Sequence, residues 1–202
     1  IPGEVDDATM QRLQASARMH FRPVLVQAMA LTAEEIEQNE AAQAEAPAPE
    51  EAPEAEPADG SDLAWITPEL QEQFDTFDCA SLQDPERGDQ PSDQPLITCS
   101  TDEQQQVRYI LGPVELTGSA INDATAGMQQ SSTGANTGQW AVNLDLDREG
   151  SEIFADTSQR LFNFQGQGAQ NQFAFVLDGE VLSAPTMQTC ITDGNPSISG
   201  TF

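Results

Sequence analysis

The chain has 202 residues, with 34 Asp and Glu against seven Arg, one His and no Lys, and its formal net charge is −27 at pH 7. This charge excludes nucleic acid and anionic lipid surfaces as direct ligands, because both would repel the chain. No apolar run reaches the roughly 18 residues that a membrane helix needs.

The first 26 residues are predicted to form a short structured piece. Asp7 is placed to cap a helix, and a strand follows from Met19 to Leu25. Side chains alternate along a strand, so His20 and Arg22 share one face. We expect this face to be the polar one, with His20 at the surface or at a contact between subdomains.

Residues 27–62 are predicted to be a flexible acidic insertion rich in Ala, Glu and Pro. Eleven acidic residues and no basic residue lie between positions 34 and 62. Such a stretch buries too little apolar area to offset its ordering entropy, and its prolines prevent a continuous helix. We expect a mobile insertion, with a role as a spacer or a cell-wall contact as the alternative.

Residues 63–106 are predicted to hold a helix and a loop between two cysteines. Phe74 and Phe77 lie on the apolar face of the helix. Cys79 and Cys99 flank a polar, Pro-rich stretch, and their spacing fits no zinc pattern. From the residues alone, a disulfide and two reduced thiols both remain open.

Strands and helices alternate from Val107 onward, which predicts an α+β layer fold with antiparallel hairpins. The predicted elements are a strand at 107–111, a helix from Gly118 carrying Ile121, Ala124 and Met128, a strand at 140–146, a helix capped by Asp147, a hairpin at 173–184 turning at Asp178-Gly179, and a strand around Ile198.

Few residues of the chain could support catalysis or metal binding. His20 is the one His, and no Gly-x-Ser-x-Gly nucleophile motif accompanies it. Asp145 and Asp147 share a strand face and could pair as metal ligands, with a solvated face and a helix cap as the alternative. Asp178 precedes Gly179 and is expected to be a turn residue. We therefore expect no catalytic residue, no metal and no cofactor.

Several separated motifs occur in the order and spacing of one family. They are Ile1-Pro2-Gly3, Ala17 to Val24, Gly112-Pro113-Val114, Trp140 to Leu144, Phe175 to Pro185 and Ile191-Thr192. Together they make the chain similar to the SecD family, membrane subunits of the bacterial protein-export machinery. The Pro-rich acidic insertion before two cysteines resembles the actinobacterial branch.

The resemblance implies an α+β fold of antiparallel and mixed sheets with helices packed on one face. A partial, ferredoxin-like base would carry an inserted head subdomain. The resemblance implies that residues 1–26 are part of the base, 107–190 the head, and 191–202 the return toward the base. Residues 27–105 match no general motif of the family, so 27–62 as the flexible insertion and 63–106 as the helix and cysteine-flanked loop follow from composition and periodicity.

The resemblance also implies a function without catalysis. The family assists the Sec channel together with SecF, contacts an unfolded preprotein outside the membrane, and uses the proton-motive force. This chain would lie on the extracytoplasmic side of the plasma membrane, anchored by transmembrane helices outside the fragment. That compartment is oxidising, which favours a Cys79–Cys99 disulfide. Cys190 is expected to be a buried free thiol.

An apolar groove is one way to hold an unfolded chain, and addition of a strand to a sheet edge is another. The candidate groove residues, which could equally be core, are Ile153, Phe154, Leu161, Phe173, Phe175 and Val181. Two other functions stay open as alternatives. An acidic secreted hydrolase would need titratable groups that converge in a pocket, and a salt-adapted scaffold domain would lose its structure at low salt.

Overall fold

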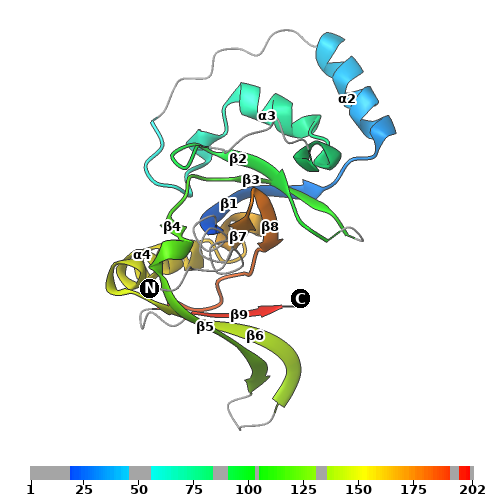
Figure 1. The fold of residues 1–202 in the computed structure, drawn as a ribbon. Helices are drawn as coiled ribbons and strands as arrows, with labels where there is room; N and C mark the ends of the chain where they lie inside the picture. Colours follow the sequence, from blue (N-terminus) through cyan, green and yellow to red (C-terminus); the bar gives the residue numbers. More distant parts are fainter. Residues whose placement is uncertain are drawn as a thin grey trace, which may run out of the picture.

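The computed structural model describes residues 19–45, 56–83, 91–102, 105–130, 136–191 and 196–200, so the helix predicted after Asp7 lies outside the described residues. They form an α+β fold with antiparallel sheets, as predicted (Figure 1). The strands are β1 (Met19–Met29), β2 (Leu96–Cys99), β3 (Val107–Leu111), β4 (Leu116–Thr117), β5 (Ile121–Gln130), β6 (Asn136–Leu146), β7 (Phe173–Leu177), β8 (Glu180–Ser183) and β9 (Ser197–Gly200). The helices are α2 (Ala33–Glu45), α3 (Pro68–Asp75) and α4 (Arg148–Phe162), with short 3₁₀ segments η1 (Leu63–Trp65), η2 (Cys79–Gln83), η4 (Gly118–Ala120) and η5 (Gly168–Asn171).

The larger sheet is built around β1. Its strand order is β2-β3-β1-β7-β8, these neighbours are antiparallel, and β4 also pairs with β1. Phe21 of β1 lies opposite Phe175, and Val24 lies opposite Leu111. The predicted boundary after residue 26 falls inside β1, so the described part of the predicted N-terminal piece shares a sheet with β3 and β7. The pattern along a strand does not reveal its partner strands, which explains the difference.

This sheet closes on itself into a small barrel-like body. Ser100, just after β2, forms a parallel bridge with Val181 of β8, and the amide of Thr101 donates to the Val181 carbonyl at 3.0 Å. Five strands joined by antiparallel pairing leave the first and last strands parallel, which is the direction of this bridge. All five strands contribute side chains to the interior: Val24, Leu96, Tyr109, Leu111, Ala174, Val176 and Val181.

Arg22 closes one end of this interior. Its side chain is fully buried, and its guanidinium donates to the carbonyls of Gln94 at 2.7 Å, Gly112 at 2.9 Å and Pro91 at 3.0 Å. The face of β1 that we predicted to be polar is therefore an interior face at Arg22. Closure of the sheet removes it from water, and the three carbonyls compensate for the lost hydration of the charge. His20, two residues earlier, is partly buried.

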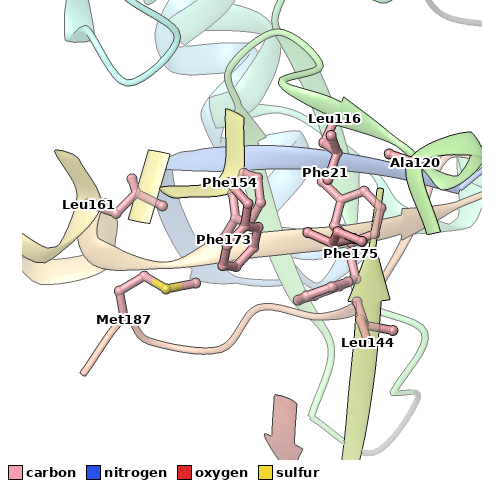
Figure 2. Close-up of a cluster of buried hydrophobic side chains, with 10 residues drawn as sticks. Phe21, Leu116, Ala120, Leu144, Phe154, Leu161, Phe173, Phe175 and Met187 are labelled. Carbon is pink, nitrogen blue, oxygen red and sulfur yellow. The ribbon is translucent and has the colours of Figure 1, made fainter. Parts of the chain in front are cut away.

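A cluster of aromatic side chains joins an outer side of the sheet to α4 (Figure 2). Phe21 and Phe175 meet edge to face with their ring centres 4.9 Å apart, and Phe154 of α4 meets Phe173 at 5.7 Å. All four rings are buried, and Leu161 of α4 is fully buried in the same cluster. Such ring pairs contribute about 0.5–1.5 kcal/mol beyond the burial of their area. The aromatic core therefore fixes α4 against β1 and β7.

Another outer side of the sheet is covered by α3. Phe74 of α3 packs with Leu25 and Ile110. The guanidinium of Arg108 lies 4.5 Å from the centre of the Phe74 ring and donates to the Phe74 carbonyl. Both helices thus pack on the outer face of the sheet, as expected, and closure of the sheet places α4 and α3 at different sides of the body.

A disulfide ties the segment after α3 to the larger sheet. It joins Cys79 of η2 to Cys99 at the end of β2, with the Cα atoms 5.8 Å apart. Cys190 is unpaired and partly exposed, whereas we expected a buried thiol.

The first part of the predicted flexible insertion, residues 27–62, is structured instead. Ala33–Glu45 form a helix of 13 residues that ends before the first proline of the stretch. The side-chain amide of Asn39 donates to the Asp75 carbonyl at 2.7 Å, so α2 lies against α3. Ala and Glu favour a helix until a proline intervenes, and this contact stabilises the helix further. Residues 46–55 lie outside the described residues, so their predicted mobility remains a prediction.

A strand, β5, replaces the helix predicted after Gly118. Gly118–Ala120 form a single 3₁₀ turn, and β5 then joins β6 and β9 in a second sheet. The β5–β6 hairpin projects away from the larger sheet (Figure 1). The spacing of apolar residues in β5 fits a helix, but the Asn, Asp, Thr and Gly between them are poor helix formers. Pairing with β6 therefore decides the conformation.

The helix α4 and the β7–β8 hairpin form as predicted. Asp147 caps α4 by accepting from the amide of Gly150 at 2.7 Å. Asp178 and Gly179 have φ angles of 51° and 88°, as a type I′ turn requires. α4 begins directly after the end of β6, and the candidate site lies at this junction.

Candidate functional site

The outer edge of β5 is open. β5 ends the order β5-β6-β9, and among the described residues no strand pairs with its other side. The amide of Leu144 donates to the Pro196 carbonyl at 3.0 Å, so Leu144 directs its backbone groups toward β9. Ala124 lies opposite Leu144. Two residues that lie opposite each other in an antiparallel pair direct their backbone groups either both toward each other or both away from each other. Because Leu144 directs its groups away from β5, the N–H and C=O of Ala124 point outward, away from β6.

The composition of β5 does little to block this edge. Natural proteins protect edge strands with Lys, Pro, bulges or short length. β5 has ten residues, contains neither Lys nor Pro, and has one charged residue, Asp123. Its pairing with β6 is irregular between Ile121 and Asp123 and between Met128 and Gln130, and regular from Asp123 to Met128. The side chains from Asn122 to Thr125 are exposed. Between these irregularities the edge offers a row of regularly spaced backbone groups to another extended chain.

A pocket of about 330 Å³ opens at the root of the β5–β6 hairpin, between η4 and the first turn of α4. Leu116, Ala120 and Ile153 form its apolar walls, and Asp147 and Glu149 place carboxylates at it. Pockets for small ligands span roughly 300–1,000 Å³, so this volume lies at the lower end of that range. The pocket suits a side chain of a polypeptide better than a large cofactor.

The pocket lies at the end of the open edge. Ile121, the first residue of β5, pairs with Leu146, the last residue of β6. Their neighbours Ala120 and Asp147 are joined by a hydrogen bond of 2.8 Å from the Asp147 amide, and both line the pocket. The pocket therefore adjoins the first residue of β5, and the irregularity between Ile121 and Asp123 separates it from the outward groups of Ala124.

Arg160 of α4 holds one wall of the pocket in place. Its guanidinium donates to the carboxylate of Glu115, a pocket residue, and to the Ser61 hydroxyl at 3.0 Å. Its Nε also lies 3.5 Å from the carboxylate of Asp59. Arg160 thus links the pocket to Asp59 and Ser61, near the end of the acidic stretch. The negative charge of Glu115 is balanced locally, whereas Glu149 is exposed.

The six residues predicted to line a groove are mostly interior. Phe154, Leu161, Phe173 and Phe175 lie together in the aromatic core, whereas Val181 lies inside the closed sheet. Ile153 is partly exposed and lines the pocket. The spacing that suggested a groove marks the faces that α4 and the hairpin bury, so these six residues do not form an open groove.

The titratable residues that the sequence suggested for catalysis or metal binding lie in strands or cap a helix. His20 lies in β1 between β4 and β7. Asp145 is exposed on β6, and Asp147 is engaged in the α4 cap. Across the described ranges, no group of three or more His, Cys, Asp and Glu is placed to hold a metal ion. In the same ranges, no helix is long and apolar enough to cross a membrane.

Sequence reasoning missed the open edge and most of the pocket. Ser119 and Glu149 were not singled out, and Ala124 was assigned to a helix face. The one local signal was the run of poor helix formers after Gly118. The pocket itself is non-local, because η4 and α4 meet only when β5 and β6 pair.

The comparisons with known proteins decide the family. Residues 95–202, more than half of the chain, match the model of the SecDF P1 head subdomain. The chain belongs to this family. SecD of Streptomyces coelicolor is 34% identical over 139 residues, which cover 67% of this chain and 23% of that protein. SecD of Mycobacterium tuberculosis H37Rv is 34% identical over 128 residues, covering 63% and 20%. The match to each of these two SecD proteins thus spans about a fifth of that protein.

Solved structures of SecDF are also similar to this chain. A crystal structure of SecDF in a super-membrane-facing form has 22% identity and a TM-score of 0.40, covering 98% of this chain and 19% of that one. SecDF from Thermus thermophilus, described as a translocon-associated membrane protein, has 20% identity and a TM-score of 0.38, with the same coverage.

Proposed function

We propose that this chain is the extracytoplasmic domain of a protein-translocation subunit and that it contacts an unfolded preprotein during export. The observation that carries this proposal is the match of residues 95–202 to the SecDF P1 head subdomain. The relatives from Streptomyces coelicolor and Mycobacterium tuberculosis are both named protein translocase subunits, which supports the same role.

The proposed role is binding and holding rather than catalysis. In the parent protein, SecF and the Sec channel would be the partners, and transmembrane helices outside this chain would anchor it and use the proton-motive force. The domain would then retain the emerging preprotein on the extracytoplasmic side and prevent it from sliding back. The comparisons give no support to the alternatives of a secreted hydrolase or a salt-adapted scaffold.

The open edge of β5 and its pocket suit such a ligand. An unfolded polypeptide offers a repeating row of backbone N–H and C=O groups and scattered apolar side chains. Backbone groups are common to every preprotein, so an edge that binds them accepts many sequences. Binding must also be weak, because the preprotein has to keep moving.

Site-specific photocrosslinking during translocation tests this function. Probes at the exposed positions Ser119, Asn122 and Glu149 of the full-length parent would face a stalled preprotein in energised inverted membranes. Glu37, exposed on α2, serves as the control position. We expect crosslinks at the first three positions that disappear when the preprotein is released. Absence of crosslinks while the parent still stimulates export would contradict preprotein contact by this domain.

A further inference from the structure

We propose that β5 binds the translocating polypeptide by strand addition, and that the pocket at its root takes an apolar side chain with a basic residue two positions away on the same face of the added strand. This inference rests on the proposed function and specifies how the contact is made. It assigns the affinity to backbone hydrogen bonds along β5 and the modest sequence preference to the pocket.

The backbone geometry of β5 supports strand addition. Ala124 points its N–H and C=O away from β6, because Leu144 opposite it directs its own groups toward β9. Ala126 lies opposite Val142, two residues along the same register, and so has the same outward orientation. Backbone groups two residues apart on one edge match the repeat of an extended ligand.

The pocket supports the side-chain preference. Leu116, Ala120 and Ile153 provide an apolar surface for one side chain of the added strand. Glu149 is exposed at the pocket, and Asp147 adds a second carboxylate. A Lys or Arg two residues from the inserted apolar residue lies on the same face of the added strand and would therefore meet opposite charge, while an acidic residue there would be repelled.

Charge also identifies the occupant as a foreign polypeptide rather than a second copy of this chain. Two copies would each bring a formal net charge of −27 to an edge-to-edge contact, and this repulsion opposes self-pairing. An unfolded segment with a basic residue has the opposite sign. The acidic character of the chain thus disfavours dimerisation through β5 and leaves the edge open to its ligand.

The test uses the purified, isotopically labelled 202-residue chain and a synthetic ten-residue peptide of alternating Val and Thr with a central Leu-Thr-Arg sequence, which places Leu and Arg on one face of the strand. NMR titration is expected to shift the amides of Ala124 and Ala126 and the resonances of Ile153. A peptide N-methylated at four consecutive central residues keeps its side chains but lacks donors on both edges there, and should bind at least about tenfold more weakly. Replacing Arg by Glu in the peptide should weaken binding severalfold.

Matched variants locate the binding to the edge and the pocket. Ala124→Pro removes one outward donor without touching the pairing with β6, because proline is tolerated where the N–H faces outward on an edge strand. Ala124→Val is its control and should bind like the parent chain. Ser119→Trp fills the pocket from an exposed position, with Ser119→Ala as control. Binding by Ala124→Pro and Ser119→Trp should fall by about tenfold or more.

The outcomes separate this inference from the proposed function. Equal binding of the N-methylated and unmodified peptides, or shifts confined to other elements, would overturn strand addition at β5 even if crosslinking shows preprotein contact. Self-association of the chain that Ala124→Pro abolishes, seen by sedimentation without peptide, would assign the edge to a second copy and also overturn it. Loss of all crosslinks in the membrane experiment would instead overturn the proposed function.

Discussion

The charged guanidinium of Arg22 lies inside the closed sheet, where three backbone carbonyls accept its hydrogen bonds in place of water. Burial lowers the pKa of Arg22 to about 10, so the guanidinium remains protonated at neutral pH. Pro91 and Gln94 precede β2, whereas Gly112 follows β3. Arg22 thereby joins the segment that enters β2 to the end of the neighbouring strand.

Replacement of Arg22 should therefore destabilise the fold strongly. Arg22→Met keeps much of the volume but leaves three carbonyls without their donor, and we expect a loss of about 3 kcal/mol in the free energy of unfolding. Arg22→Lys keeps a charge and donors but not the planar fork, so its loss should be smaller. Urea unfolding followed by circular dichroism measures both. A loss below about 1 kcal/mol for Arg22→Met would show that the three bonds contribute little.

Alternation along β1 predicted which side chains share a face, but not which face meets water. Phe21 and Arg22 point to opposite sides, as expected for a strand. Both are nevertheless fully buried, because one side meets α4 and the other lies inside the closed sheet. Closure depends on the contact between Ser100 and Val181, which are far apart in the sequence, so no local pattern predicts it.

Among the elements, α4 depends on a single capping carboxylate. The Asp147 side chain accepts from the Gly150 amide at 2.7 Å, and this acceptor is lost in Asp147→Ala. We expect a loss of about 1 kcal/mol in the free energy of unfolding, with Asp147→Ser retaining most of it. Thermal unfolding of the three proteins tests this. Equal stability of the Ala and Ser variants would mean that the cap does not limit α4.

The start of α2 should be sensitive to acid. The carboxylate of Glu35 accepts from the Thr32 amide at 2.8 Å and from its hydroxyl at 2.9 Å. These bonds, the backbone one first, lower the pKa of Glu35 from its ordinary value of 4.5. A lowered carboxylate pKa stabilises the folded form above the ordinary value, and this contribution disappears as the pH falls through the folded value.

Hydrogen exchange at the first turn of α2 measures this effect. After correction for intrinsic rates, protection of the Glu35 and Ile36 amides should fall as the pH is lowered below about 4.5, the ordinary glutamate value. Glu35→Gln, which cannot ionise, should show no such change over the same range. A pH dependence that is the same in both proteins would assign the loss to other groups.

Capping and turn residues correctly predicted α4 and the β7–β8 hairpin. The same kind of local signal failed for β5, because its conformation depends on pairing with another strand. Asp147 and the pair Asp178-Gly179 fix their elements within a few residues. β5 has apolar residues at helical spacing, so its conformation depends on pairing with β6. The open edge of the candidate site is a property of that pairing, which is why the sequence alone placed the site elsewhere.

At the scale of the whole molecule, the disulfide between Cys79 and Cys99 connects the segment after α3 to the larger sheet. The two cysteines are 20 residues apart. A loop of this length predicts roughly 3 kcal/mol of stabilisation from the restricted unfolded chain. Reduction, or the double change Cys79→Ser and Cys99→Ser, should lower the free energy of unfolding by that amount. Urea unfolding with and without reductant tests it, and an identical midpoint under both conditions would contradict a structural role for the bond.

The α+β class, the family and most strands could be predicted from patterns and motifs in the chain. The closed sheet, the placement of α2 on α3 and the pocket could not, because each joins residues distant in sequence. The contact of Asn39 with Asp75 and the meeting of Ala120 with Asp147 are examples. Functional surfaces assembled in this way need the tertiary structure before they can be named.

Preprotein export in energised inverted membranes tests strand addition at β5 most directly. The full-length parent would carry either Ala124→Pro or Ala124→Val, at equal amounts in the membrane. We expect Ala124→Val to support export at the normal rate and Ala124→Pro to reduce the rate toward that of membranes without the parent, with crosslinks at Asn122 lost in parallel. Equal export rates and equal crosslinking for the two variants would contradict a role for the β5 edge.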